Sequence, residues 1–510
     1  MSLPPHLEAL RSDLEARARG YGLDFFETRF EIVPYDRINE IAAYGGFPTR
    51  YPHWRFGMEY DQLSKSSEYG LSKIYEMVIN TDPAYAYLLE GNALMDQRTV
   101  IAHVFGHVDF FKNNYYFSQT DRKMVDKMAN HATQVRRLID KLGLERVEAF
   151  IDVCLSVDNL VDPYAPFLQR APAKAPEAEE LTGDRGPIFK LPAREYMEDF
   201  INPPEFIEEQ KRKHKEEVSK RRHFPYAPQR DVLGFLLEYA PLEGWEFEIL
   251  NIIRAEAYYF APQGMTKIMN EGWATYWHSK ILTEGALPPD EIIDYAETYA
   301  RIVATSPGSL NPYALGVEIW RDIEERWNRG MFGDAWESCE RLDERERFDL
   351  QLGLGRQKMF QVRALYNDIS FLDEFLTPDL VERQRLYNFG YDPRSRSWRI
   401  ETREFENVKR RIIDGLTNFG NPLIAVRDAN FRNSAQLLLS HRYTDAPLRA
   451  DYAEKVLTNL YQLWKRPVWV ETFVPKGNGR DKPAPLEGVL LGFDGERFTQ
   501  EKWPHEPIPW

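Results

Sequence analysis

Cysteine is scarce in this chain of 510 residues, which contains only Cys154 and Cys339. Two cysteines so far apart in the sequence cannot form the disulfide framework that holds small secreted domains together. They also cannot supply the several thiolates of a metal–sulfur cluster. Histidine is uncommon too, with 10 residues, so a metal site in this chain would combine a few imidazoles with carboxylates.

An excess of positive charge is also lacking. Asp and Glu number 80 against 65 Lys and Arg, and the formal net charge is −15. A general nucleic-acid binder needs a basic surface, and a protein attracted to anionic lipid needs a polybasic segment. We therefore expect neither a nucleic-acid partner nor binding to a membrane surface.

Long apolar runs are missing as well. None approaches the roughly 18 residues of a membrane-spanning helix, and the N-terminal segment lacks the apolar core of a signal peptide. Hydrophobic residues nevertheless make up 43% of the chain, which is enough for extensive cores, and this length favours two or three domains. The expectation is a cytoplasmic protein without a membrane span.

Two regions of different pattern are visible. Helical periodicity dominates residues 1–395, interrupted by a long insertion rich in proline and charge at about residues 162–230. Residues 396–510 instead predict the order α-β-β-α-β-β, a smaller α+β domain with a four-stranded antiparallel sheet backed by two helices. Such a separate unit would suit partner binding or regulation.

The most informative feature is the pair His103 and His107, four residues apart in a segment predicted to be helical. Positions i and i+4 share one face of a helix, so both imidazoles can approach one ion. Downstream, Glu271 and His278 are seven residues apart, about two helical turns. These four residues are the predicted metal ligands.

The segment Asn270-Glu-Gly-Trp-Ala274 is similar to the one around the third ligand of some zinc aminopeptidases. With Glu271 as third ligand, the site would be zincin-like, and the fold mostly α around a His-x-x-x-His helix core. Zinc is the expected metal, and additional ligands would make manganese or iron suitable. Asp96, seven residues before His103, is placed to orient an imidazole.

One departure concerns the general base. Zincins carry a glutamate directly after the first histidine, whereas this chain has Val104. A hydrolase of this kind would need its base elsewhere, and Glu256 and Asp109 are the candidates. The alternative is that the histidines are core residues whose polar atoms are satisfied by Glu271 and Asp109, without a metal.

Several segments together resemble the SpoVR family, named for stage V sporulation protein R. They are His103-Val-Phe-Gly-His-Val-Asp-Phe-Phe-Lys-Asn-Asn114, residues 256–263 and 266–281, Asn311-Pro-Tyr-Ala-Leu-Gly316 and residues 367–378. The resemblance implies a link to formation of the spore cortex, a peptidoglycan layer. In bacteria that do not sporulate, it implies a stress pathway with protein partners from an operon that encodes a serine kinase.

Two functions therefore remain open. One is a metal-dependent hydrolase acting on a peptide or a peptidoglycan-related amide. The other is a non-catalytic regulatory protein of the kinase-linked pathway, in which the His/Glu cluster is a structural metal site or a buried polar network. Both functions depend on the His/Glu cluster, so the first question for the structure is whether His103, His107 and Glu271 lie close together.

Overall fold

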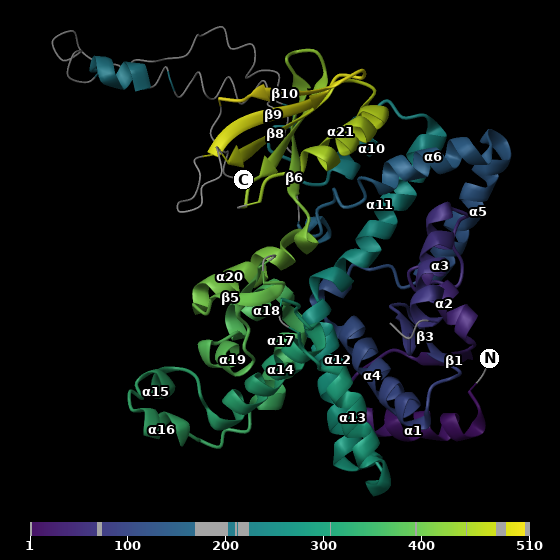
Figure 1. The fold of residues 1–510 in the computed structure, drawn as a ribbon, viewed down its shortest axis with the longest axis vertical. Helices are drawn as coiled ribbons and strands as arrows, with labels where there is room; N and C mark the ends of the chain where they lie inside the picture. Colours follow the sequence, from purple (N-terminus) through teal and green to yellow (C-terminus); the bar gives the residue numbers. More distant parts are fainter. Residues whose placement is uncertain are drawn as a thin grey trace. The chain divides into compact units, whose positions relative to one another are not determined.

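The computed structural model describes residues 3–68, 74–168, 202–209, 212, 224–306, 308–392, 395–444, 446–475 and 486–504. Most of the predicted insertion at 162–230 lies outside these residues. Within them the chain is mostly helical and carries a sheet near its C-terminus, as the sequence predicted (Figure 1). No helix of the described ranges has both the length and the apolar character that crossing a bilayer requires.

The chain forms two compact units whose borders differ from the predicted boundary at residue 395. The first unit comprises residues 1–148 and 258–420, and the second comprises residues 149–257 and 421–510. The sequence could not indicate this division, because it depends on contacts between segments far apart along the chain. Residues 396–420, predicted to belong to the C-terminal domain, are part of the first unit.

Helices make up most of the first unit. Its longer helices are α1 (Pro5–Gly20), α2 (Tyr35–Ala43), α3 (Trp54–Glu68), α4 (Leu94–Asn113), α5 (Met124–Leu142), α12 (Lys267–Ile281), α13 (Ile292–Ile302), α14 (Pro312–Arg329), α17 (Gly355–Leu365), α18 (Asp368–Phe375) and α20 (Phe405–Leu416). The main hydrophobic core of this unit gathers buried side chains of α4, α12 and α14, among them Phe105, Trp273 and Trp320. α12 packs against both α4 and α14.

A three-stranded sheet in the first unit was not fully anticipated. β1 (Thr28–Val33) pairs in parallel with β3 (Ala84–Leu89), and β2 (Glu76–Ile79) pairs with β3 in antiparallel orientation. The β-prone run within residues 72–81 predicts a short strand, which β2 confirms, whereas the pattern from Ala84 onward predicts helix, which β3 shows to be wrong. β3 is the central strand and largely buried, and a short continuous apolar run cannot be distinguished from a helix by periodicity.

Glycine allows the three central helices to approach closely. A Cβ on Gly106 of α4 would lie 2.7 Å from the Cα of Ala274 on α12, and one on Gly316 of α14 would lie 2.7 Å from the Cα of Gly272. Side-chain carbons do not come this close to backbone. The absence of a side chain at these positions therefore sets the spacing of α4, α12 and α14.

Buried and capping polar groups fix the ends of these helices. Asp368 accepts hydrogen bonds from the backbone N–H groups of Ile268 and Met269, at 2.8 and 2.9 Å, in the first turn of α12. Asn311 accepts from the N–H groups of Tyr313 and Ala314 at the start of α14. Both satisfy helix N-terminal donors that have no partner within the helix.

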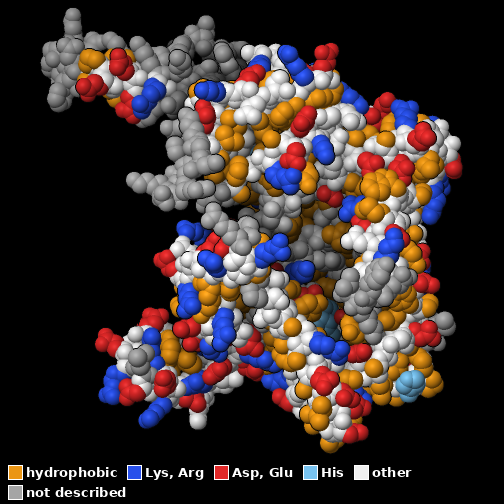
Figure 2. Space-filling model, in the orientation of Figure 1, with side chains coloured by type: hydrophobic (Ala, Val, Ile, Leu, Met, Phe, Trp, Pro, Cys, Tyr) orange, Lys and Arg blue, Asp and Glu red, His pale blue; other side chains and the backbone are white. Residues whose placement is uncertain are grey.

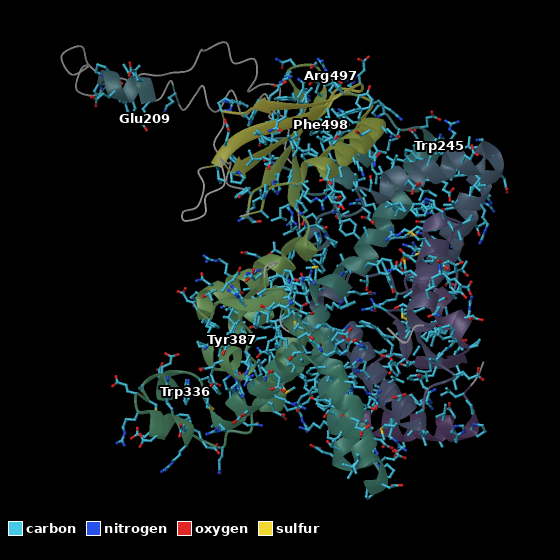
Figure 3. All side chains as sticks on the ribbon, in the orientation of Figure 1. Glu209, Trp245, Trp336, Tyr387, Arg497 and Phe498 are labelled. Atoms are coloured by element: carbon cyan, nitrogen blue, oxygen red, sulfur yellow. The ribbon has the colours of Figure 1, made fainter. Side chains whose placement is uncertain are left out.

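The second unit holds five strands in the order β10-β9-β8-β7-β6. They are β6 (Leu423–Phe431), β7 (Gln436–Arg442), β8 (Val468–Pro475), β9 (Leu486–Phe493) and β10 (Phe498–Lys502), and the unit also contains α10 (Val232–Tyr239) and α21 (Ala450–Trp464). The order of elements agrees with the sequence prediction, but the predicted four-stranded antiparallel sheet is wrong. β10 adds a fifth strand that begins at Phe498, directly after Arg497 (Figure 3). β7 pairs in parallel with β8 because α21 crosses over between them.

We expect Gly316→Ala to destabilise the protein by about 1–3 kcal/mol, the usual range for overpacking a close contact. The same change at Gly57, a helical position on α3 where an added Cβ would have no atom within 4 Å, should be neutral or stabilise by up to about 1 kcal/mol. Chemical denaturation of both variants measures the difference. Equal stability of the two variants would contradict the close-packing account.

Candidate metal centre

His103, His107 and Glu271 converge, as the sequence predicted. The Nε2 atoms of His103 and His107 lie 3.6 and 3.5 Å from Oε2 of Glu271, and the ligand atoms of all three residues lie within 4.8 Å of one another. The histidines come from one face of α4, and the glutamate comes from the facing side of α12. Two segments more than 160 residues apart thus meet at one point.

These separations suit a metal ion better than direct hydrogen bonds. An N–H···O bond is usually 2.7–3.2 Å long, and no described residue donates a hydrogen bond to Oε2 of Glu271. Ligand atoms about 2.1 Å from a tetrahedral zinc ion would be about 3.4 Å apart. The spacing and the donor set of two imidazoles and one carboxylate therefore fit such an ion.

Both imidazoles are held at their other nitrogen by side chains of α12. Nδ1 of His107 lies 3.0 Å from Oδ1 of Asn270, and Nδ1 of His103 lies 3.0 Å from Nδ1 of His278. His278 thus contacts the ring nitrogen of His103 that does not face Glu271, and it is not among the three grouped ligand atoms.

Burial keeps His107 and His278 neutral. It lowers the pKa of His107 to about 4, with a further lowering from His103, and it places the pKa of His278 well below its ordinary value. Burial alone would raise the pKa of Glu271, but its interactions with the two imidazoles outweigh this and lower it. A carboxylate beside the neutral imidazole of His107 is a state that binds a divalent cation.

Two residues that the sequence did not single out interact with this cluster. Tyr313 of α14 stacks on His103 with ring centroids 6.1 Å apart, and its interaction with Glu271 helps to lower the pKa of that carboxyl. Glu76 of β2 has a pKa raised to about 7, mainly by burial and also by the charges of Glu271 and Asp96, while His103 lowers it. Its only sequence signal was membership of a β-prone segment.

The remaining predicted residues fall in different places. Asp96 lies in the first turn of α4 and interacts electrostatically with Glu76; it is not one of the three grouped residues. Glu256 is buried on α11 (Gly244–Met265), in the part of that helix assigned to the second unit. It stays a candidate base.

The contacts of Asp109 give it a structural role and do not support its predicted role as a base. Oδ2 of Asp109 accepts hydrogen bonds from Nε1 of Trp273 and from Nη1 of Arg363, both at 2.8 Å, and Oδ1 accepts from the N–H of Asp24. The side chain is fully buried. Asp109 therefore ties α4 to α12 and α17, behind the histidine face.

Comparison with known proteins establishes the family. A family model described as SpoVR like protein matches residues 3–421, and one described as SpoVR-like C-terminal domain matches residues 422–474. The chain belongs to the SpoVR family. It is 30% identical over 492 residues to the uncharacterized protein YcgB of Escherichia coli (strain K12), with 91% of each chain covered. No solved structure matches.

The lowered pKa of His107 predicts that acid destabilises the metal-free protein. The unfolded chain takes up a proton near pH 6.5 and the folded chain only near pH 4, so the stability contributed by neutral His107 is present above pH 6.5 and falls as pH decreases toward 4. The full loss is about 3 kcal/mol. Urea denaturation in a chelator, followed by tryptophan fluorescence at pH 7 and pH 5, measures it.

His107→Gln should flatten this pH dependence. His6→Gln, which changes an exposed histidine of α1, should leave it unchanged. Equal pH dependence in wild type and His107→Gln would show that His107 is not held neutral by the fold.

Proposed function

We propose that this SpoVR-family chain binds one divalent metal ion, zinc in the first instance, through His103, His107 and Glu271, and uses it to hydrolyse an amide. The observation that carries the proposal is the convergence of their three ligand atoms at 3.5 and 3.6 Å, with Oε2 of Glu271 lacking a donor among the described residues. Manganese or iron would suit the same donors if further ligands join them.

A zinc ion held by three protein ligands supplies Lewis acidity and lowers the pKa of a bound water to near neutrality. The chain's own contribution is to hold two imidazoles and one carboxylate in place. Tyr313 interacts with Glu271 and helps to keep that carboxyl ionised. The protein thus offers the donor set of a hydrolytic centre on rigid helices.

Glu76 suits the role of the missing base. Val104 occupies the position where zincins carry their glutamate. The pKa of Glu76, raised to about 7 mainly by burial, lies near the value at which a carboxylate exchanges protons most effectively at neutral pH. Glu76 interacts electrostatically with His103 and Glu271, two of the proposed ligands, and with Tyr313. Glu256 is the second candidate.

The substrate class rests on family membership. The link of the family to the spore cortex favours an amide in a peptide or in a peptidoglycan-related molecule. Its association with a serine-kinase pathway favours protein partners from that operon and a role in the stress response.

One observation favours the non-catalytic alternative. His103 and His107 are only 5% and 6% exposed, and a structural metal site is closed by protein groups whereas a catalytic one keeps a position open. In that case the ion would stabilise the first unit, and regulation would act through bound partners. Loss of activity without loss of stability, on metal removal, would favour the hydrolase.

We predict about one equivalent of metal per chain in protein prepared without chelator and resupplied with Zn²⁺, Mn²⁺ and Fe²⁺. His103→Ala combined with His107→Ala should abolish binding, and Glu271→Gln should weaken it because the charge is lost. The matched control is His6→Ala with His131→Ala, which removes two other histidines. Elemental analysis showing less than about 0.1 equivalent in folded wild type would refute the metal site.

A second prediction concerns the base. Glu76→Gln should retain metal and lower the rate of amide hydrolysis by about 100- to 10,000-fold, the range for loss of a general base. A panel of peptides and peptidoglycan fragments, analysed by mass spectrometry, supplies the assay. Glu90→Gln, at an exposed carboxylate, is the control. Unchanged hydrolysis by Glu76→Gln would exclude Glu76 as the base.

A further inference from the structure

Helix α12 contributes more than a ligand to the candidate centre. Besides Glu271, it carries Asn270 and His278, which contact the Nδ1 atoms of His107 and His103 respectively, each at 3.0 Å. Each imidazole of α4 therefore faces Glu271 with its Nε2 and contacts a second side chain of α12 with its Nδ1. These contacts limit which nitrogen of each ring can carry the proton.

The contact with Asn270 fixes the proton position of His107, because Oδ1 of the amide faces Nδ1 of the ring at 3.0 Å. Oδ1 of an amide only accepts hydrogen bonds, so Nδ1 of His107 must be the donor. A neutral imidazole carries a single N–H, which leaves Nε2 of His107 with its lone pair exposed toward Glu271. That is the form in which histidine binds a metal.

The pair of His103 and His278 has two arrangements. If Nδ1 of His103 donates, its Nε2 is free for an ion and His278 carries its proton on Nε2. If Nδ1 of His278 donates, Nε2 of His103 carries the proton and cannot bind a metal. The two Nδ1 atoms are 3.0 Å apart, so one of them must donate, and the choice decides whether His103 can be a ligand.

We propose that His278 is a positioning residue that accepts the hydrogen bond from Nδ1 of His103 and so keeps Nε2 of His103 available to the metal. This rests on the metal site of the proposed function, and it replaces the expectation that His278 is itself a ligand. Carboxylates and carbonyl oxygens usually hold ligand histidines in this way; here a third imidazole does so.

The packing around His278 restrains its ring, and the proton on Nε2 that this role requires is buried without an acceptor among the described residues. Its side chain is fully buried, and the rings of Tyr295 and Tyr299 on α13 lie nearly perpendicular to it with centroids 6.3 Å away. These packed rings restrain the imidazole. His278 belongs to the same helix, α12, as Glu271. One helix therefore supplies the carboxylate ligand and also orients the imidazole of His103.

Two substitutions separate the roles of His278. His278→Asn can present an acceptor oxygen near the position of Nδ1, as Asn270 does for His107, whereas His278→Leu has no acceptor. We expect Co²⁺ and Zn²⁺ affinities of His278→Asn within about 3-fold of wild type, and of His278→Leu weaker by about 10- to 100-fold. The visible absorption of bound Co²⁺ should be unchanged in His278→Asn.

Each other outcome overturns the proposal. If His278 is a ligand, both variants lose affinity and the Co²⁺ spectrum of His278→Asn changes. If His278 only fills the core, both variants bind as wild type does. Thermal unfolding of the metal-free variants controls for folding. Should His278→Leu not fold, His278→Gln also removes the acceptor near Nδ1, because its amide reaches the position of Nε2.

A measurement without metal keeps this inference separate from the proposed function. In metal-free protein with ¹⁵N-labelled histidine at pH 8, the ring nitrogens should show His103 and His107 protonated on Nδ1 and His278 protonated on Nε2. Single substitutions of each histidine assign the signals. A proton on Nε2 of His103 would overturn the proposal, whether or not the protein binds metal.

Discussion

The close approach of α4 to α12 is the constraint on which the candidate centre depends. Gly106 lies one residue before His107, and a side chain there would meet the backbone of Ala274, three residues after Glu271. Gly272, next to Glu271, brings α12 against α14 in the same way, and α14 carries Tyr313. Hydrogen bonds from Trp273 of α12 and Arg363 of α17 to Asp109 of α4 hold these helices together on the side away from the ligands. The ligand geometry is thus a consequence of helix spacing.

The sequence predicted the parts of the centre that have a local signal. The i, i+4 spacing of His103 and His107 fixes a shared helix face, and the segment around Glu271 indicated the third ligand. Glu76 and Tyr313 had no such signal, because a strand residue and a residue in the first turn of another helix reach the cluster only through tertiary packing. His278 shares a helix face with Glu271, but its contact with Nδ1 of His103 depends on helix spacing that no sequence pattern encodes.

In the fold, too, the sequence predicted the features with a local signal and missed those that depend on distant contacts. Strong periodicity predicts helices over residues 264–282, 313–329 and 449–464, and α12, α14 and α21 lie close to these bounds. The buried strand β3 was predicted as helix, and the grouping of residues 149–257 with residues 421–510 was not foreseen, since both are decided by distant contacts. On the visible face in Figure 2, acidic and basic side chains of the described residues are interspersed.

The most direct test of the central claim is anomalous diffraction from crystals of the zinc-loaded protein. The account predicts one peak about 2.0–2.2 Å from Nε2 of His103, Nε2 of His107 and a carboxylate oxygen of Glu271, with Nδ1 of His103 still in contact with His278. A peak at other residues, or direct hydrogen bonds between the imidazoles and Glu271 with no peak between them, would contradict it.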